Sequence, residues 1–284
     1  MGGGRQFCTI SVYGQEAQLD TWRMAKINLA IRGIEADFGD ENADTFFNDK
    51  HKDKEFDVIF ANPPFNLKAW GQEKLIDDVR WKYGIPPANN ANYAWIQHMI
   101  HHLAPKGKIG LVLANGALTS MTGGEGEIRK NIIEADLVEA IVALPSQLFY
   151  SVQIPVSLWF FNRAKKQARK TVFIDARGMG VMEDRTHKII THEEIKKIAK
   201  TVHDFQAGKD VDEKGFAAVV TTERIAEEDY RLTPGVYVGI AEKEDDGEPI
   251  KEKMARLQKE LMAMFEESHK LEDEIKKQLA GLKL

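Results

Sequence analysis

Short apolar runs alternate with stretches of helical periodicity over residues 1–164, and this alternation predicts the fold class. An apolar run of four to eight residues between turn signals is typical of a buried strand, whereas apolar residues three and four apart indicate a helix. Strands that alternate with helices predict an α/β fold with a largely parallel sheet and helices on both of its faces. The expected strands lie at 56–61, 108–114, 137–143 and 154–161, and the expected helices at 93–103 and 128–135.

The apolar run at 56–61, FDVIFA, is the most distinct of these strands. Charged residues precede it and Asn-Pro-Pro follows it. A run of this length between such boundaries predicts a central strand that is buried on both faces.

The residues before this strand predict shorter elements. A β-favouring run at 8–13 is expected to form a strand. Asp20 or Thr21 is expected to cap the helix that follows, and Gly33 is expected to end it. A second short strand is expected at 34–38.

Beyond residue 164 the regular alternation stops. A basic connector at 165–170 leads into a strand at 171–174, a loop and a polar helix, so residues 165–240 predict a small α+β extension of the core at 1–164. The charged stretch at 242–249 contains Gly and Pro, and it marks a boundary.

The last segment, 250–284, predicts a long helix with a heptad seam. A strict 3.5-residue repeat favours a left-handed coiled coil, so we expect this helix to pack on a partner helix. The alternative is packing on the body of the chain itself. The seam consists of Ile250, Met254, Leu257, Leu261, Met264, Ser268, Leu271 and Ile275.

The composition is that of a globular protein. A chain of 284 residues allows one large domain, or one domain with an appendage. Its 43% hydrophobic and 29% charged residues exclude general disorder and a fibrous design. The net charge of −5 excludes a basic nucleic-acid coat. No run of 18 apolar residues occurs, so no membrane-spanning segment is expected.

Cysteine and histidine usage argues against disulfides and metal sites. The single cysteine, Cys8, excludes a disulfide framework and a multi-cysteine zinc site, and it favours a reduced, cytoplasmic protein. We interpret Cys8 as a core residue. His98 and His102 have a spacing that suits zinc, but no HExxH pattern or third ligand accompanies them, so no metal is expected.

The residues with the clearest chemical meaning are Asn62, Pro63, Pro64 and Phe65, which follow the strand at 56–61. In open α/β sheets, ligands bind beyond the carboxyl ends of the strands. Proline has a fixed φ and no N–H, so this loop is stiff and offers acceptors but few donors. Phe65 adds a flat apolar face beside them.

Two oxygen acceptors and a ring suit an exocyclic amino group on a planar heterocycle, such as adenine N6. The Asn62 side-chain oxygen and the Pro63 carbonyl could grip the two amino hydrogens and expose the nitrogen lone pair for direct methyl transfer. No cysteine nucleophile is needed for that reaction. The alternative is that Asn-Pro-Pro is only a rigid turn.

The sequence at 57–66, DVIFANPPFN, resembles the signature of amino-group DNA methyltransferases. The resemblance extends over nearly the whole chain to the modification subunit of type I restriction–modification systems. It implies a Rossmann-like methyltransferase fold that uses S-adenosylmethionine to methylate adenine N6 in DNA. The strings that resemble this subunit lie at 13–16, 22–25, 28–33, 80–84, 92–95, 124–129, 144–149, 153–155 and 229–235.

The resemblance also implies roles for single residues. Glu16 is expected to hold the ribose hydroxyls of S-adenosylmethionine, and Asp44 to accept from the adenine amino group of this cofactor. Asn62 is expected to border the cofactor as well, and Phe149 to stack with Phe65 on a flipped target base. The alternative for Glu16 is a surface glutamate, and the alternative for Phe149 is a core phenylalanine. For Asp44, another acidic residue nearby could take the role.

The family pattern is not matched at the amino terminus. The glycine motif that binds the cofactor should follow a first strand, but only Gly2, Gly3 and Gly4 precede the strand at 8–13. We therefore expect an N-terminally truncated, incomplete fold without the first strand and its glycine loop. Whether such a chain binds the cofactor is left open.

The resemblance further implies partners. These are double-stranded DNA, a specificity subunit docked on residues 250–284, a second copy of the modification subunit, and a restriction subunit. Two alternatives stay open: a non-catalytic assembly module, or a methyltransferase that acts on RNA or on a protein glutamine.

Overall fold

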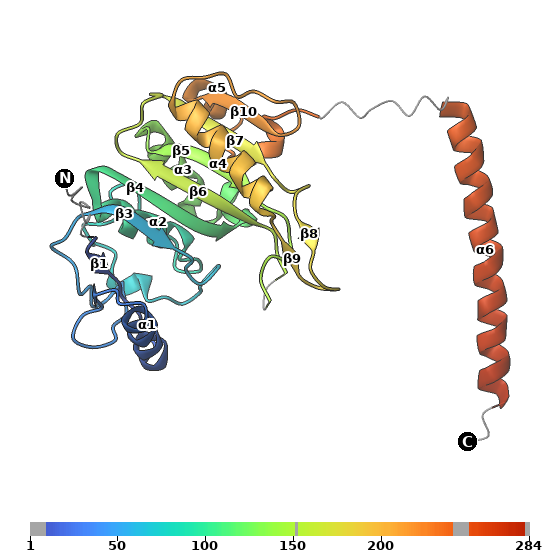
Figure 1. The fold of residues 1–284 in the computed structure, drawn as a ribbon, viewed down its shortest axis with the longest axis horizontal. Coiled ribbons are helices and arrows are strands. Elements are labelled where there is room, and N and C mark those ends of the chain that lie inside the picture. Colours follow the sequence, from blue (N-terminus) through green and yellow to red (C-terminus); the bar gives the residue numbers. More distant parts are fainter. Residues whose placement is uncertain (1–9, 151–152, 241–249, 282–284) are drawn as a thin grey trace, which may run out of the picture. The chain divides into compact units, whose positions relative to one another are not determined.

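The computed structural model describes residues 10–150, 153–240 and 250–281 (Figure 1). The chain divides into two compact units, Met1–Ala241 and Glu242–Leu284. All the strands described belong to the first unit, and a single helix is described in the second.

A six-stranded mixed sheet forms the centre of the first unit. β3, β4, β5 and β7 run in one direction, whereas β6 and β10 are antiparallel to their neighbours. No described helix connects β5 to β6, and a direct connection favours antiparallel pairing because a parallel pair needs a crossover. The spatial order is β10 (Ala217–Thr221), β7 (Lys170–Asp175), β5 (Val138–Ala143), β6 (Val156–Asn162), β4 (Leu103–Ala114) and β3 (Phe56–Ala61).

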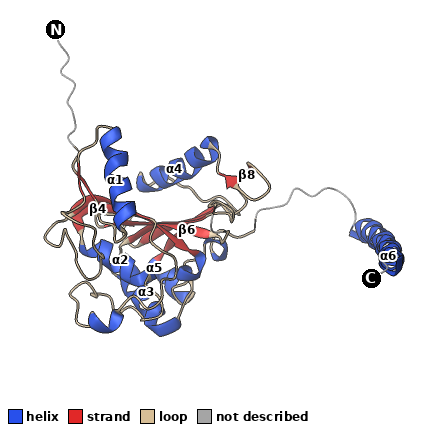
Figure 2. Cartoon of the chain, turned by 90° about the horizontal axis from the view of Figure 1, so that it is seen from below, coloured by secondary structure: helices blue, strands red, loops and turns tan. Residues whose placement is uncertain are grey.

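Helices cover both faces of this sheet, as predicted. α2 (Asn92–His101), α3 (Glu125–Glu134) and α5 (Thr222–Glu227) lie on one face, and α4 (His192–Gln206) lies on the other (Figure 2). Side chains alternate between the faces of a strand, so Ile141 and Phe173 pack with α2 and α3, while Val142 and Ile174 pack with α4. β5 and β7 are thus buried on both sides, which agrees with their largely apolar sequences.

β3 is the exception, and the prediction of a central, doubly buried strand is wrong for it. β3 pairs with β4 on one side only and forms the edge of the six-stranded sheet. Val58 is 56% and Phe60 80% exposed. The physical reason is that β1 (Val12–Tyr13) pairs in parallel with β2 (Ala36–Asp37), so that no strand of the described residues covers the second edge of β3.

The amino-terminal helix also differs from its prediction. α1 (Leu19–Ile31) begins one residue before Asp20, with Gln18 at the N-cap, so neither Asp20 nor Thr21 caps it. Gly33 follows the helix with a φ of +67°, in the left-handed region that glycine adopts without strain. None of the residues of α1 is buried. Cys8 lies outside the described residues.

Residues 165–240 contribute to the same sheet through β7 and β10, and α4 packs against it. The Thr191 side chain caps α4 in a reciprocal arrangement with Glu194, which fixes where the helix begins. The shorter elements are η1 (Gln72–Lys74), η2 (Asn115–Leu118), η3 (Thr122–Gly124), η4 (Pro234–Val236), β8 (Val181–Met182) and β9 (Lys188–Ile189).

The second unit contains α6 (Ile250–Gly281), as the heptad pattern predicts. Its seam residues from Met254 to Ile275 are exposed, with Leu257 at 47% and Met254 at 65%. The side chain of Ile250 lies outside the described residues. Among the helices described, α6 included, none has an apolar stretch long enough to cross a membrane.

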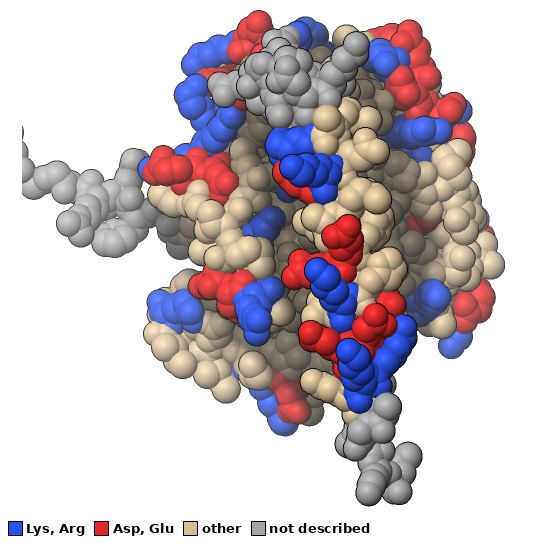
Figure 3. Space-filling view, turned by 90° about the vertical axis from the view of Figure 1, so that its right-hand side faces the viewer, with Lys and Arg blue, Asp and Glu red and all other residues tan. Residues whose placement is uncertain are grey.

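Charges of both signs are mixed on the surface. Figure 3 shows acidic and basic side chains interspersed on the face that it presents, without a broad area of one sign. Charge on this face therefore gives no indication of a surface for nucleic acid.

Candidate active site

The acceptor loop, residues 62–65, starts where β3 ends at Ala61. Asn62 and Pro64 are exposed, Pro63 is buried and Phe65 is half-buried. In the described part of the chain the Asn62 side chain makes no hydrogen bond, and neither proline has an N–H to donate. The loop thus presents oxygen acceptors at the carboxyl end of a strand that runs parallel to its neighbour.

The end of this loop is fixed by the first residue of α2. The Asn66 N–H donates to Asn92 Oδ1 at 3.1 Å, and Asn92 Nδ2 donates to Asn66 Oδ1 at 2.9 Å. Asn92 is only 1% exposed. Asn66 has a φ of +53°, which asparagine tolerates better than most residues. The paired amides therefore determine where the acceptor loop turns away from β3.

Phe149 lies beside the acceptor loop although 84 residues separate it from Phe65 in the sequence. The two ring centroids are 6.2 Å apart and the rings are inclined by 70°, in an edge-to-face arrangement. Both rings are half-buried and pack against the core on the α4 side of the sheet. The structure thus brings together the two aromatic residues to which the sequence assigned base stacking.

Glu16 and Asp44 form a second pair of neighbouring residues. The Glu16 carbonyl accepts the N–H of Ala43, the residue before Asp44, at 2.9 Å. Glu16 Oε1 accepts the Gln18 N–H at 2.8 Å, and Asp44 Oδ1 accepts the N–H groups of the next turn. No hydrogen bond among the described residues uses the second carboxylate oxygen of either side chain. Each carboxylate thus has one oxygen that is free to accept a further hydrogen bond.

Gln15 connects the segments that carry Glu16 and Asp44 through backbone hydrogen bonds. The sequence analysis assigned no role to Gln15. Its Nε2 donates to the carbonyls of Ala43, at 3.1 Å, and Asn48, at 2.8 Å. Its Oε1 accepts the N–H of Lys50 at 2.9 Å. One side chain thus joins the end of β1 to the loop that carries Asp44.

Among the described residues, no hydrogen bond, ion pair or ring contact joins Glu16 or Asp44 directly to Asn62 or Phe149. Both pairs are instead connected to α2 through other side chains. Between β1 and β3 lies a mostly apolar cleft of about 540 Å³, lined by side chains of both strands and by Trp95 and Met99 of α2.

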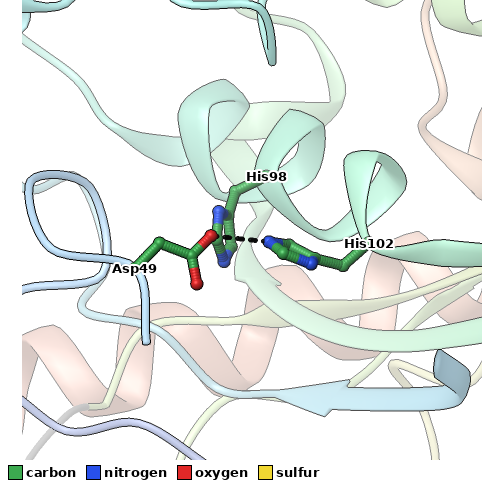
Figure 4. Close-up of side chains that lie close together, drawn as sticks. All are labelled: Asp49, His98 and His102. Atoms are coloured by element: carbon green, nitrogen blue, oxygen red, sulfur yellow. Dashed lines mark hydrogen bonds and ion pairs between the residues drawn. The ribbon is translucent and has the colours of Figure 1, made fainter. Parts of the chain in front are cut away.

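Three side chains that suit a metal, Asp49, His98 and His102, lie together where α2 ends (Figure 4). His102 Nε2 bonds to Asp49 Oδ2 at 2.8 Å, and its Nδ1 bonds to the Lys54 carbonyl at 2.8 Å. Because a carbonyl and a carboxylate only accept, both ring nitrogens of His102 carry protons.

The electrostatics of this cluster follow from its hydrogen bonds. Burial opposes the charge on His102, but the bonds to Asp49 and Lys54 raise its pKa above the usual value. Burial likewise opposes the charge on Asp49, yet His102 and the His51 N–H lower its pKa to about 2. Burial, His102 and Arg80 lower the pKa of His98 to about 3. The hydrogen bonds from His102 to Asp49 and to the Lys54 carbonyl thus hold this cluster together.

The expectation that no third candidate ligand accompanies His98 and His102 is wrong, because Asp49 lies beside them. The spacing itself places both histidines on one face of a helix, since i and i+4 residues are neighbours there. The sequence does not show that this face meets Asp49 and Arg80. The same holds for Asn92, because its pairing with Asn66 depends on how residues 67–91 return to α2.

A sequence model of the N-6 DNA methylase family matches residues 4–246. The chain belongs to this family. It is 53% identical to the type I restriction enzyme HindI methylase subunit of Haemophilus influenzae, over 96% of the chain and 62% of that subunit. It is 45% identical to the MjaIX methylase subunit of Methanocaldococcus jannaschii, over 96% of the chain and 50% of that subunit.

Solved structures resemble the fold as well. The type I restriction–modification methyltransferase subunit from Streptococcus thermophilus superimposes with a TM-score of 0.71 at 27% identity, over 81% of this chain and 48% of that one. The EcoKI M protein gives a TM-score of 0.61 over 93% of this chain and 60% of that one, a likeness of fold at 19% identity. The predicted resemblance and the predicted methyltransferase fold are confirmed. The chain spans about half to three-fifths of the length of these relatives.

Proposed function

We propose that this chain is the methyltransferase part of a type I modification subunit, which transfers a methyl group to adenine N6 in DNA. The observation that carries the proposal is the acceptor loop: Asn62 is free to accept at the end of β3, and Phe65 and Phe149 stand beside it. The 53% identity to the HindI methylase subunit favours DNA over RNA or a protein as substrate.

In this proposal the target adenine leaves the duplex and its amino group meets the acceptor loop. Asn62 Oδ1 and the Pro63 carbonyl accept the two N6 hydrogens, which favours a pyramidal nitrogen with an available lone pair. Phe65 and Phe149 hold the base, because an extruded base needs stacking partners in place of its neighbours. After transfer the nitrogen loses one proton to solvent.

The residues present fit the cofactor at two points. S-adenosylmethionine supplies an activated methyl group when bound. The free carboxylate oxygen of Glu16 suits a ribose hydroxyl, and that of Asp44 suits the adenine amino group. Since Gln15 and the Glu16 carbonyl hold both acids together, the two contacts form one preassembled site.

The proposal includes partners. The exposed seam of α6 suits a helix of a specificity subunit, which would select the DNA site. A second modification subunit and a restriction subunit complete the proposed assembly. Since charges are mixed on the face in Figure 3, these partners would supply much of the phosphate contact.

Methyl transfer to DNA, measured with the specificity subunit present, tests the role of Asn62. We expect Asn62→Ala to lower transfer about a hundredfold or more, because a lost transition-state acceptor costs on that order. Binding of S-adenosylmethionine, measured by calorimetry, should change little. Asn28→Ala is the matched control, since Asn28 is exposed on α1. Near-normal transfer by Asn62→Ala would refute the proposed role.

A further inference from the structure

Arg80 is buried in a way that local structure does not explain. Its side chain is 7% exposed, and all five N–H bonds of the guanidinium have acceptors. Arg80 Nε donates to Asp78 Oδ1 at 2.8 Å and Nη2 to Asp78 Oδ2 at 2.7 Å. The other three N–H bonds reach residues far away in the sequence.

A second Asp-x-Arg pair in the same unit shows what the local motif does by itself. Arg177 Nε donates to Asp175 Oδ1 at 2.8 Å and Nη2 to Asp175 Oδ2 at 2.6 Å, which repeats the geometry of Arg80 and Asp78. Among the described residues, the Arg177 side chain makes no hydrogen bond besides these two, and it is about half-exposed. The ion pair thus forms without burial, so the burial of Arg80 serves its other three bonds.

Two of these bonds hold the turn that Asp44 begins. Arg80 Nη1 donates to the Thr45 carbonyl at 3.2 Å, and Nη2 donates to the Phe46 carbonyl at 2.6 Å. The amide side of the same turn is held by Asp44 itself, whose Oδ1 accepts the N–H groups of Phe46, at 2.8 Å, and Phe47, at 3.3 Å. Arg80 and Asp44 therefore fix opposite sides of one turn.

The last bond joins this turn to α2. Arg80 Nη1 lies 3.1 Å from His98 Nδ1, and since arginine only donates, His98 accepts and is neutral. Phe46 adds an apolar anchor, because its ring contacts Trp70, Trp81 and Trp95 at centroid distances of 5.0, 6.4 and 4.3 Å. Asp44 thus stands on a turn that cannot shift without breaking contacts on both sides.

We propose that Arg80 is a positioning residue of the cofactor site: it fixes the Asp44 turn against α2 and thereby sets the affinity for the adenine end of S-adenosylmethionine. The inference rests on the proposed function of Asp44. Arg80 itself touches no cofactor in this proposal. It acts through the carbonyls of Thr45 and Phe46.

Binding of S-adenosylmethionine by the full chain tests this role with three variants. Arg80→Gln removes the charge. Arg80→Lys keeps the charge and can pair with Asp78, but an ammonium cannot span two carbonyls and a histidine at once. Arg177→Gln is the control, because it breaks the matching ion pair away from Asp44.

We expect both Arg80 variants to weaken binding about tenfold or more, since each loses hydrogen bonds from a charged donor. The control should bind as the wild type does. In methyl transfer to DNA, the KM for S-adenosylmethionine should rise while kcat changes little, a split that general destabilisation does not produce. Binding by Arg80→Lys as tight as that of the wild type would overturn the proposal.

Amide hydrogen exchange at Phe46 and Phe47 separates this inference from the proposed function. Both amides should exchange faster in the Arg80 variants, and their exchange should be unchanged in Arg177→Gln. If the wild type shows no saturable binding of S-adenosylmethionine, the assigned cofactor site is refuted. Amide exchange alone then tests whether Arg80 fixes the Asp44 turn. Unchanged exchange of the Phe46 and Phe47 amides in Arg80→Lys would show that Arg80 does not fix this turn. If Arg80→Gln fails to fold, Arg80→Lys supplies the result.

Discussion

Asn92 shows how one side chain connects a helix to the acceptor loop. Its amide makes both hydrogen bonds that the Asn66 backbone and side chain require, and it is almost completely buried. The amide side chain suits this position because it carries an acceptor oxygen and a donor nitrogen side by side. The position of Asn62 therefore depends on a residue 30 positions later in the sequence.

We expect Asn92→Ala to lower methyl transfer tenfold to about a hundredfold, because the acceptor loop would lose its alignment with the target base. The free energy of unfolding should fall by about 1–3 kcal/mol, since the two hydrogen bonds between Asn92 and Asn66 are lost. Affinity for S-adenosylmethionine should stay unchanged. Asn131→Ala is the control, because Asn131 lies on α3 and the substitution removes a single side-chain hydrogen bond, to the Tyr83 carbonyl. Unaltered transfer by Asn92→Ala would contradict this account.

The ion pair of His102 and Asp49 makes stability depend on pH. The folded-state pKa of His102 is raised, so its contribution is fully present below the unfolded value near 6.5 and is lost as pH rises through the folded value. The pKa of Asp49 is lowered to about 2, so its contribution is present above about pH 4 and is lost as pH falls towards 2.

His102→Gln should therefore lose more stability at about pH 5.5 than at about pH 8.5, measured by urea unfolding at both values. His203→Gln, at an exposed position on α4, should show no such difference. An equal loss at both pH values would mean that the charge on His102 does not stabilise the loop at 49–54.

At the scale of elements, the apolar runs predicted strands well because burial preference is a local property. β5 and β7 were predicted within one residue at either end. The same reasoning failed for β3, since a pattern shows that Val58 and Phe60 prefer burial but not which element covers them. The candidate site shows the same contrast between local and long-range information. Asn62, Phe65 and Glu16 can be picked out from the sequence by residue type and by their position after a strand. No local pattern reveals the contacts that Arg80, Gln15 and Asn92 make with residues distant in the sequence.

The exposed edge of β3 should promote self-association, because an apolar edge strand offers free backbone groups and side chains to another copy. Phe60→Lys should shift the chain towards the monomer in sedimentation experiments. Since Phe60 is 80% exposed, the fold should be unaffected. Val79→Lys changes a similarly exposed apolar residue in a loop and should not have this effect. If both variants behave alike, surface charge and not the strand edge controls association.

At the scale of the whole molecule, the proposed function assigns chemistry to the first unit and recognition of a partner to the second. The first unit carries the acceptor loop and the two acids, and the described residues of the second unit form α6 with its exposed seam. The apolar side chains of α6 are exposed, so contacts within its own unit stabilise this helix little. We therefore expect a partner helix to bury these side chains.

We expect replacement of Leu257 and Leu261 by glutamate to abolish co-purification with the specificity subunit, because two charges would enter a packed seam. Affinity for S-adenosylmethionine should remain. The control places glutamates at Ala255 and Ala263, which are exposed outside the seam of the same helix and add the same charge. If the seam variant still co-purified, or if both variants failed, the partner would not dock on the seam. Deletion of residues after Pro249 should act like the seam variant, since it removes α6 entirely.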